Sequence, residues 1–215
     1  MEKQKNDLIK GNLPVQFNNR MNITFTGPQC SGKTTLLKKM RSSGGIFDKF
    51  FYINEVTRKI RDECNVPINE DGANDVTQLL IINEELKNLF NNSSIDSWCR
   101  GTVHDRCLLD GLVYTEYFHD KKLVSQQVWQ QAVNYWYRFH SKYDIIFYPD
   151  PHEVMLADDG ERSIDNEFRN AIIERYEDHY LNQFLWKDRV TILKGTVEER
   201  MEQIKIKLHE QGIRQ

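Results

Sequence analysis

The octapeptide Gly27–Thr34, which reads G-P-Q-C-S-G-K-T, constrains the fold of this chain more than any other segment. The short apolar run Met21–Thr26 precedes it, and Thr34–Met40 follows it as the predicted opening of a helix. A strand, a loop of the form G-x-x-x-x-G-K-T and a helix are the sequence context of a phosphate-binding P-loop, or Walker A motif. The sequence therefore predicts an α/β protein that binds a nucleoside triphosphate.

Each fixed position of this loop has a chemical reason. Gly27 and Gly32 let the backbone wrap closely enough for its N–H groups to face a phosphate chain. Lys33 brings a positive charge to the outer phosphates, and the Thr34 hydroxyl can hold Mg²⁺. The start of the following helix, including Thr35, adds its positive dipole end. We therefore expect ATP and Mg²⁺ as cofactors, with nucleotide contacts from Gly27, Pro28, Gln29, Cys30, Ser31, Gly32, Lys33, Thr34 and Thr35.

The overall composition fits one folded domain. The chain has 215 residues, 39% of them hydrophobic, and is long enough to bury a sizeable core. Residues 1–20 are polar and lack periodicity, so we expect a flexible N-terminal arm followed by one P-loop domain over residues 21–215. No apolar run approaches the roughly 20 residues that span a membrane, and the N-terminus lacks the apolar core of a secretion signal.

Charge and cysteine content narrow the functional classes. The formal net charge of −3 disfavours a protein whose main role is to hold nucleic acid, although a local basic groove is compatible with it. The cysteines form no C-x-x-C pair and no Cys/His cluster, which indicates reduced thiols in a cytoplasmic protein. They are Cys30, Cys64, Cys99 and Cys107.

Strand-like and helix-like segments alternate along the chain. The predicted strands are Asn22–Thr26, Phe50–Asn54, Gly101–Asp105, Asp144–Tyr148 and Arg189–Leu193. The predicted helices after the P-loop are Asp75–Phe90, Ser125–His140, Asp165–Trp186 and Val197–His209. This alternation predicts a mainly parallel sheet covered on both faces, with ligands at the carboxyl ends of the strands.

Two of the predicted helices have apolar stripes. Asp75–Phe90 carries a stripe at spacings near 3.6, formed by Val76, Leu79, Leu80, Asn83, Leu86 and Phe90. Asp165–Trp186 carries one at steps of four, formed by Phe168, Ile172, Tyr176, Tyr180 and Phe184. The stripe of Asp165–Trp186 indicates core packing rather than a cofactor site.

The second predicted strand ends before Glu55, at the functional edge of the sheet. A carboxylate here can accept a proton from a substrate hydroxyl or bind a sugar. It can also be an ordinary acid at the start of a helix. Arg58, one turn later, is either a phosphate contact or a solvated charge.

The third strand ends in Asp105-Arg106. A carboxylate beside a P-loop is a typical partner of nucleotide-bound Mg²⁺, and an adjacent arginine can reach the transferred phosphate. The alternative is a buried ion pair at a strand end. His104 is assigned to packing, and whether Glu55 or Asp105 is the catalytic base stays open.

Two further segments follow the fourth and fifth strands. The polar block Asp158–Ser163 contains Arg162, which fits a lid arginine that closes over the phosphates, with Arg169 in support; an ordinary charged surface loop is the alternative. After the fifth strand, Gly195 and Thr196 lie where an adenine ring can rest. Thr196 is also a predicted helix cap, with Glu199 completing a capping box.

Four sequence features together resemble a known family of small P-loop kinases. They are the P-loop, the N-E-x-x-R of Asn54–Arg58, the D-R of Asp105-Arg106 followed by Leu109-Asp110 and Tyr114, and the Y-D-x-x-F…D-D-G-x-R that spans Tyr143–Arg162. The family includes the ribosylnicotinamide kinase domain of the NAD-metabolism regulators, which are NadR-like AAA-domain proteins. More widely, the order of features resembles nucleoside and nucleoside monophosphate kinases. The resemblance covers Met21–Gly212.

The resemblance implies both a fold and a reaction. The fold is a three-layer P-loop NTPase with a five-stranded, mainly parallel sheet of the nucleoside monophosphate kinase type and a lid segment. The reaction is ATP- and Mg²⁺-dependent phosphoryl transfer to a small nucleoside or nucleotide, as part of nucleotide metabolism. By matched position it implies catalytic or metal-binding roles for Lys33, Thr34, Asp105 and Arg162.

Two other functions remain as alternatives. A kinase acting on a nucleic-acid end or base would use the aromatic residues between Tyr114 and Tyr143 for stacking, although their helical spacing favours core packing. A P-loop ATPase without a small acceptor, such as a switch or motor, is disfavoured because no N-K-x-D motif occurs and the third strand ends in D-R.

Overall fold

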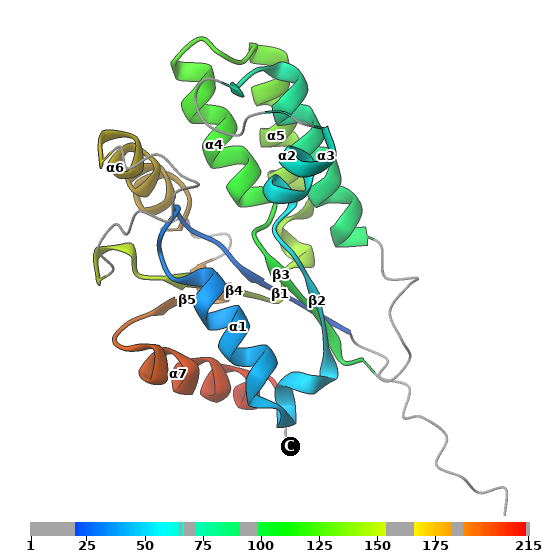
Figure 1. The fold of residues 1–215 in the computed structure, drawn as a ribbon, viewed down its shortest axis with the longest axis vertical. Helices are drawn as coiled ribbons and strands as arrows, with labels where there is room; N and C mark the ends of the chain where they lie inside the picture. The colour runs from blue at the N-terminus through cyan, green and yellow to red at the C-terminus, as the bar shows by residue number, and fades with distance from the viewer. Residues whose placement is uncertain are drawn as a thin grey trace, which may run out of the picture.

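The computed structural model describes residues 20–64, 66, 72–90, 99–153, 166–181 and 187–213. Within these residues the centre is a five-stranded parallel sheet in the order β2-β3-β1-β4-β5 (Figure 1). The strands are β1 (Met21–Phe25), β2 (Phe50–Ile53), β3 (Gly101–Asp105), β4 (Ile145–Pro149) and β5 (Val190–Leu193). All five predicted strands are confirmed, each to within one residue.

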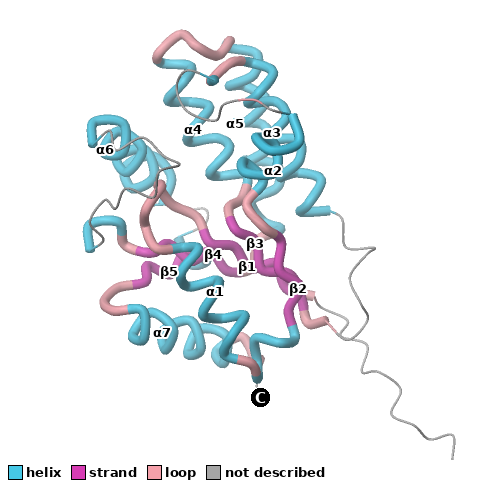
Figure 2. The backbone as a smooth tube through the Cα atoms, in the orientation of Figure 1, coloured by secondary structure: helices cyan, strands magenta, loops and turns pink. Residues whose placement is uncertain are grey.

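Helices cover both faces of the sheet, so the predicted three-layer α/β fold is confirmed (Figure 2). One face carries α1 (Lys33–Ser43) and α7 (Val197–Glu210). The other carries α3 (Asp75–Phe90), α4 (Leu108–Asp120), α5 (Gln126–Phe139) and α6 (Asn166–Glu174). The helix α2 (Val56–Cys64) packs against α3.

The strand residues alternate between two separate cores, as the pleat of a central strand requires. In β4, Ile145 and Phe147 belong to the core under α1 and α7, while Ile146 and Tyr148 belong to the core under the other helices. All four are fully buried or nearly so. Burial on both faces is what makes β4 a continuous apolar run in the sequence.

Gly101 of β3 pairs with Met21 of β1. A Cβ atom added at Gly101 would lie 2.0 Å from the Met21 carbonyl oxygen. A glycine is therefore required at the start of β3, where it sets the register that brings Asp105 opposite Phe25.

The helix α3 is confirmed with the predicted bounds, but the residues of its predicted stripe are only partly buried. Val76, Leu80 and Phe90 are exposed, at 65%, 36% and 49% of their accessible surface. The buried face consists of Thr77, Gln78, Ile81, Ile82, Glu85 and Leu89. Leu79 and Leu86 of the stripe are partly buried against the same core, and half of the buried residues are polar, so hydrophobic periodicity alone does not mark the buried face.

Two other helices differ from expectation. The sequence pattern did not single out α4, because nine of its thirteen residues are buried, so it lacks an amphipathic period. The helix predicted over Asp165–Trp186 is regular only to Glu174 and continues as a π-helix over Arg175–Leu181. Its predicted core residues Phe168, Ile172 and Tyr176 are buried.

In the described part of the chain, no helix combines the length and apolar character needed to cross a bilayer.

Candidate functional site

The carboxyl ends of the strands gather the predicted site residues at one edge of the sheet. The P-loop follows β1, Glu55 follows β2, and Asp105 ends β3. Because the strands are parallel, segments far apart in the sequence lead into the same region. The predicted edge is thus the edge at which these side chains meet.

The P-loop begins with backbone that only glycine accommodates well. Gly27 has φ +134°, and an added Cβ would lie 3.2 Å from the ring of Tyr148. The loop ends where α1 starts, at Lys33. Lys33 Nζ donates hydrogen bonds to the carbonyl oxygens of Gly27 (2.8 Å) and Pro28 (2.7 Å) and to Ser31 Oγ (3.2 Å).

The Lys33 ammonium is buried and lies near a second positive charge, that of Arg106. Burial, followed by the nearby charge of Arg106, lowers the pKa of Lys33 to about 7. Asp110, Asp105 and Glu55 act in the opposite direction. Phosphate oxygens in this loop would supply the missing negative charge and restore the ordinary protonation of the lysine.

Asp110, on the first turn of α4, connects the P-loop with the end of β3. Its Oδ2 accepts from Thr26 Oγ1 (2.8 Å) and from the Cys107 N–H (2.9 Å). Its Oδ1 accepts from Arg106 Nη1 (3.0 Å) and, at 3.4 Å, from the Gly27 N–H. The Tyr176 hydroxyl also donates to Oδ1, at 2.8 Å. One fully buried carboxylate therefore holds three segments of the site together.

Arg106 is committed to two carboxylates rather than exposed to a substrate phosphate. Its Nε donates to Glu55 Oε1 at 2.8 Å and its Nη1 to Asp110 Oδ1 at 3.0 Å, and its guanidinium lies over the Tyr114 ring. Its φ of +81° is unusual for a residue with a side chain, and these contacts hold it there. In this structure Arg106 forms the buried ion pairs that were the alternative expectation, and its contact with a transferred phosphate stays a prediction.

Glu55 is held in place by two arginines. Besides Arg106, the Arg58 Nε donates to its Oε2 at 2.9 Å. The Glu55 side chain is only 7% exposed, while Arg58 is 38% exposed. Arg58 thus orients the glutamate, which was not among the two roles considered for it from the sequence.

Asp105 has the opposite character, because one of its oxygens is left free. Its Oδ1 is buried and has no hydrogen-bond partner among the described residues. Burial and the repulsion of Glu55 raise the pKa of Asp105, while Lys33 and Arg106 act against this. A free carboxylate oxygen beside a P-loop fits the ligand preference of Mg²⁺, which takes one or two carboxylates together with phosphate oxygens.

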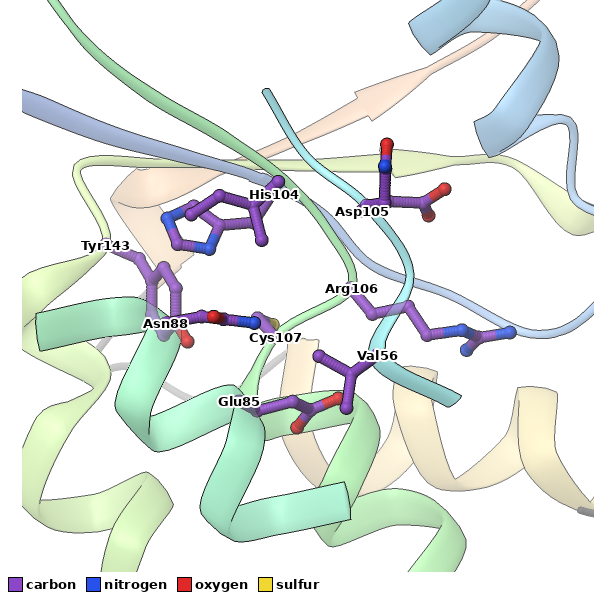
Figure 3. A pocket seen from close by; sticks show the side chains of 10 residues that line it. Val56, Glu85, Asn88, His104, Asp105, Arg106, Cys107 and Tyr143 are labelled. Atoms are coloured by element: carbon purple, nitrogen blue, oxygen red, sulfur yellow. The ribbon is translucent and has the colours of Figure 1, made fainter. Parts of the chain in front are cut away.

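A small pocket lies between the ends of β2 and β3 and the helix α3 (Figure 3). In this view Glu85 and Arg106 lie on one side of it, and Asn88, His104 and Tyr143 on the other. Both carboxylate oxygens of Glu85 are buried without a hydrogen-bond partner among the described residues. Burial, followed by the repulsion of Asp110, raises the pKa of Glu85 well above its usual range.

The remaining predicted residues have different outcomes. Thr196 caps α7 with Glu199 as its capping-box partner, as predicted. Arg169 donates to the carbonyl oxygen of Pro151 at 2.6 Å, so it anchors the loop after β4. Arg162 and the rest of Asp158–Ser163 lie outside the described residues. Contacts of nucleotide with the P-loop residues, Gly195 and Thr196 stay predictions.

The sequence reasoning assigned no role to Asp110 or Glu85. The signal for Asp110 was present, since it lies at position N3 of a helix that begins directly after Asp105-Arg106, where an acid can bind the N-cap amide. Glu85 carried no such signal, because a glutamate in a helix is normally solvated.

Comparisons with known proteins show which family the sequence matches and which solved structures have a similar fold. The model of a family described as AAA domain matches residues 22–200. No curated protein matches the sequence. Among solved structures, a NadR protein in complex with NR superposes with a TM-score of 0.68 and 19% identity, over 93% of this chain and 54% of that chain. This chain therefore spans about half the length of that NadR protein.

Two kinases of similar length share the fold. A deoxyadenosine kinase from M. mycoides with bound dATP has a TM-score of 0.61 and 16% identity, over 88% of this chain and 100% of that chain. A thymidylate kinase from Candida albicans has a TM-score of 0.61 and 14% identity, over 90% and 93%. With a family model that matches most of its length, the chain belongs to the AAA domain family, in a P-loop fold similar to that of nucleoside and nucleotide kinases.

Proposed function

We propose that this chain is an ATP- and Mg²⁺-dependent phosphotransferase that acts on a small nucleoside or nucleotide. The observation that carries the proposal is the meeting of three groups at one sheet edge. They are the P-loop with Lys33, a carboxylate with a free oxygen at Asp105, and a glutamate oriented by arginines at Glu55. A phosphoryl transferase needs positioning and charge neutralisation more than covalent chemistry, and these groups supply both.

Lys33 would neutralise the outer phosphates. Its ammonium already donates hydrogen bonds to Gly27, Pro28 and Ser31 of the loop, and phosphate oxygens could replace these acceptors. Phosphate oxygens are stronger acceptors for an ammonium than neutral carbonyls. We therefore infer that Lys33 turns from its own loop to the nucleotide when the nucleotide binds.

Thr34 and Asp105 would hold Mg²⁺, with the remaining ligands from phosphates and water. The ion, when bound, would neutralise charge on the phosphate oxygens. The free Oδ1 of Asp105 is the feature of this chain that fits such a ligand.

Glu55 is our candidate for the group that accepts the proton of the acceptor hydroxyl. Its pairing with Arg106 and Arg58 fixes its orientation, and it follows the strand next to the one that bears Asp105. Asp105 remains the alternative base, because its pKa is raised. Arg162 is kept as the proposed lid arginine on the sequence argument alone.

An acceptor screen with γ-labelled ATP tests the proposal. The panel contains nucleosides, nucleoside monophosphates and short oligonucleotides, each with the wild-type protein and with Lys33→Ala. We expect transfer to at least one nucleoside or nucleotide, and a rate at least 100-fold lower in Lys33→Ala while the protein stays folded.

Other outcomes would redirect the assignment. Steady ATP hydrolysis without any labelled acceptor would favour a P-loop ATPase. Transfer confined to oligonucleotides, with steep loss between 50 and 200 mM salt, on the order of 10³-fold, would favour a nucleic-acid kinase. Full activity of Lys33→Ala would contradict the P-loop mechanism itself.

A further inference from the structure

The side chain of Arg200, on the first turn of α7, reaches three loops at the functional edge of the sheet. Its Nη1 donates to the carbonyl oxygen of Ser31 in the P-loop at 3.2 Å. Its Nε donates to the carbonyl oxygen of Gly195 after β5 at 2.9 Å, and its Nη2 to that of Asp150 after β4 at 3.3 Å. One guanidinium thus bridges the loops that follow β1, β4 and β5.

A carboxylate completes this bridge. Glu153 Oε2 accepts from Arg200 Nη2 at 3.0 Å and from the Gly195 N–H at 2.6 Å. Arg200 is 4% exposed, so its charge is removed from water and balanced by Glu153 and three carbonyl oxygens. Because the Arg200 guanidinium is buried and each of its three nitrogens donates a hydrogen bond, losing these bonds is costly, which makes the spacing between the loops hard to change.

The loop after β5 is fixed along its whole length by side chains from outside it. Gln203 of α7 bonds to both the N–H and the carbonyl oxygen of Lys194. Glu199 accepts from the Thr196 N–H at 2.7 Å. With the Gly195 amide and carbonyl bound by Glu153 and Arg200, each backbone N–H of residues 194–196 already has an acceptor. The position of this loop is therefore dictated by α7 and the β4 loop.

We propose that Arg200 is a positioning residue of the nucleotide site, which sets the distance between the phosphate loop and loop 194–196. The proposal rests on the proposed function and on the prediction that the adenine of ATP lies at Gly195 and Thr196. Base and phosphates are parts of one molecule, so their binding free energies add only when the two subsites are held at matching separation. The planar guanidinium suits this role, because its donors point to several acceptors at once, whereas an ammonium is a single point charge.

The proposal predicts how two ligands respond to loss of Arg200. Tripolyphosphate occupies only the phosphate loop, whereas ATP occupies both subsites. In the wild type ATP should bind more tightly than tripolyphosphate. In Arg200→Met that ratio of dissociation constants should fall about 10-fold or more, because the base no longer meets its loop at the required distance.

Isothermal titration calorimetry with Mg²⁺, ATP and tripolyphosphate measures the ratio directly. The variants are Arg200→Met, Arg200→Lys and the control Lys205→Met. Lys205 lies on the same helix with its side chain 45% exposed, and pairs only loosely with Glu202 at 3.5 Å. Arg200→Lys keeps the charge and carries the test if Arg200→Met does not fold, and it should also lower the ratio. Lys205→Met should leave it unchanged.

If Arg200 had a merely structural role, its loss would weaken the binding of ATP and of tripolyphosphate alike. An unchanged ratio of the two dissociation constants in the folded variants would therefore overturn the proposal. Equal affinity of the wild type for ATP and tripolyphosphate would overturn it as well. Failure of the wild type to bind either ligand would refute the nucleotide site and the inference with it. ATP binding with the expected ratio but no acceptor would refute the kinase function alone.

Discussion

Replacing Asp110 by asparagine removes one negative charge and one acceptor oxygen from the centre of the site, at almost unchanged side-chain volume. Asp110 is 2% exposed and accepts hydrogen bonds from Thr26, Gly27, Arg106, Cys107 and Tyr176. An asparagine has one acceptor oxygen instead of two, and an NH₂ group in place of the other. It can therefore no longer satisfy all of these donors.

The size of the effect follows from which donors lose their acceptor. If the amide oxygen replaces Oδ1, the bonds from Arg106 and Tyr176 remain, but the bond from Arg106 is weakened by about 1–1.5 kcal/mol, because its acceptor no longer carries a negative charge. The Thr26 hydroxyl can rotate and accept from the new NH₂ group. The Cys107 N–H then faces another donor, and a buried unsatisfied amide costs about 1–3 kcal/mol. We expect Asp110→Asn to lose about 2–4 kcal/mol of the free energy of unfolding.

Urea denaturation at pH 7 is the assay, with Asp120→Asn as the matched control. Asp120 lies at the end of the same helix, is 57% exposed and pairs with Arg175. Exposed ion pairs contribute at most about 1 kcal/mol, so the control should lose less than that. A loss in Asp110→Asn no larger than in Asp120→Asn, at equal m-values, would refute the reasoning that Asp110 holds these segments together.

Two further substitutions test other carboxylates of the site. Because burial raises the pKa of Glu85, this residue binds more protons in the native protein than in the unfolded chain above pH 4.5, and its contribution to stability falls as pH rises from there. Glu85→Gln should remove this pH dependence. Above pH 4.5 its free energy of unfolding should exceed that of the wild type by a difference that grows by up to about 1.4 kcal/mol per pH unit, and below pH 4.5 the difference should vanish. Parallel profiles of stability against pH from pH 4 to 8 would contradict this expectation. Glu55→Gln should lower kcat at least 10-fold with ATP affinity within about 2-fold, measured by initial rates and calorimetry, and an unaltered kcat would move the base role to Asp105.

Much of the fold could be predicted because local sequence patterns coincide with the final environment. The central strands are apolar runs, since they are buried on both faces, and the P-loop is a contiguous motif whose function lies largely in its own backbone. Strand alternation then predicts the edge at which Lys33, Glu55 and Asp105 meet. The capping box at Thr196 and Glu199 is equally local and was confirmed.

The errors occur where polar residues are buried. The buried face of α3 includes Gln78 and Glu85, so the apolar residues of this helix do not by themselves mark that face. Gln78 Oε1 accepts from the Thr115 hydroxyl of α4 at 3.1 Å, a contact across 37 residues of sequence. A buried polar residue is recognisable only once its partner is known, and the partner is supplied by packing.

The sequence alone predicts a P-loop in a parallel α/β sheet, because the backbone conformation of the loop and the burial of the strands each require a local pattern of residues. The contacts of each charged side chain at the sheet edge could be read only from the tertiary structure. Among the residues that the structure describes, Arg106 pairs with Glu55 and Asp110, Oδ1 of Asp105 has no hydrogen-bond partner, and Arg200 bridges three loops. The role of a charged side chain depends on the charges that packing brings within a few ångströms of it, and no local pattern records those neighbours.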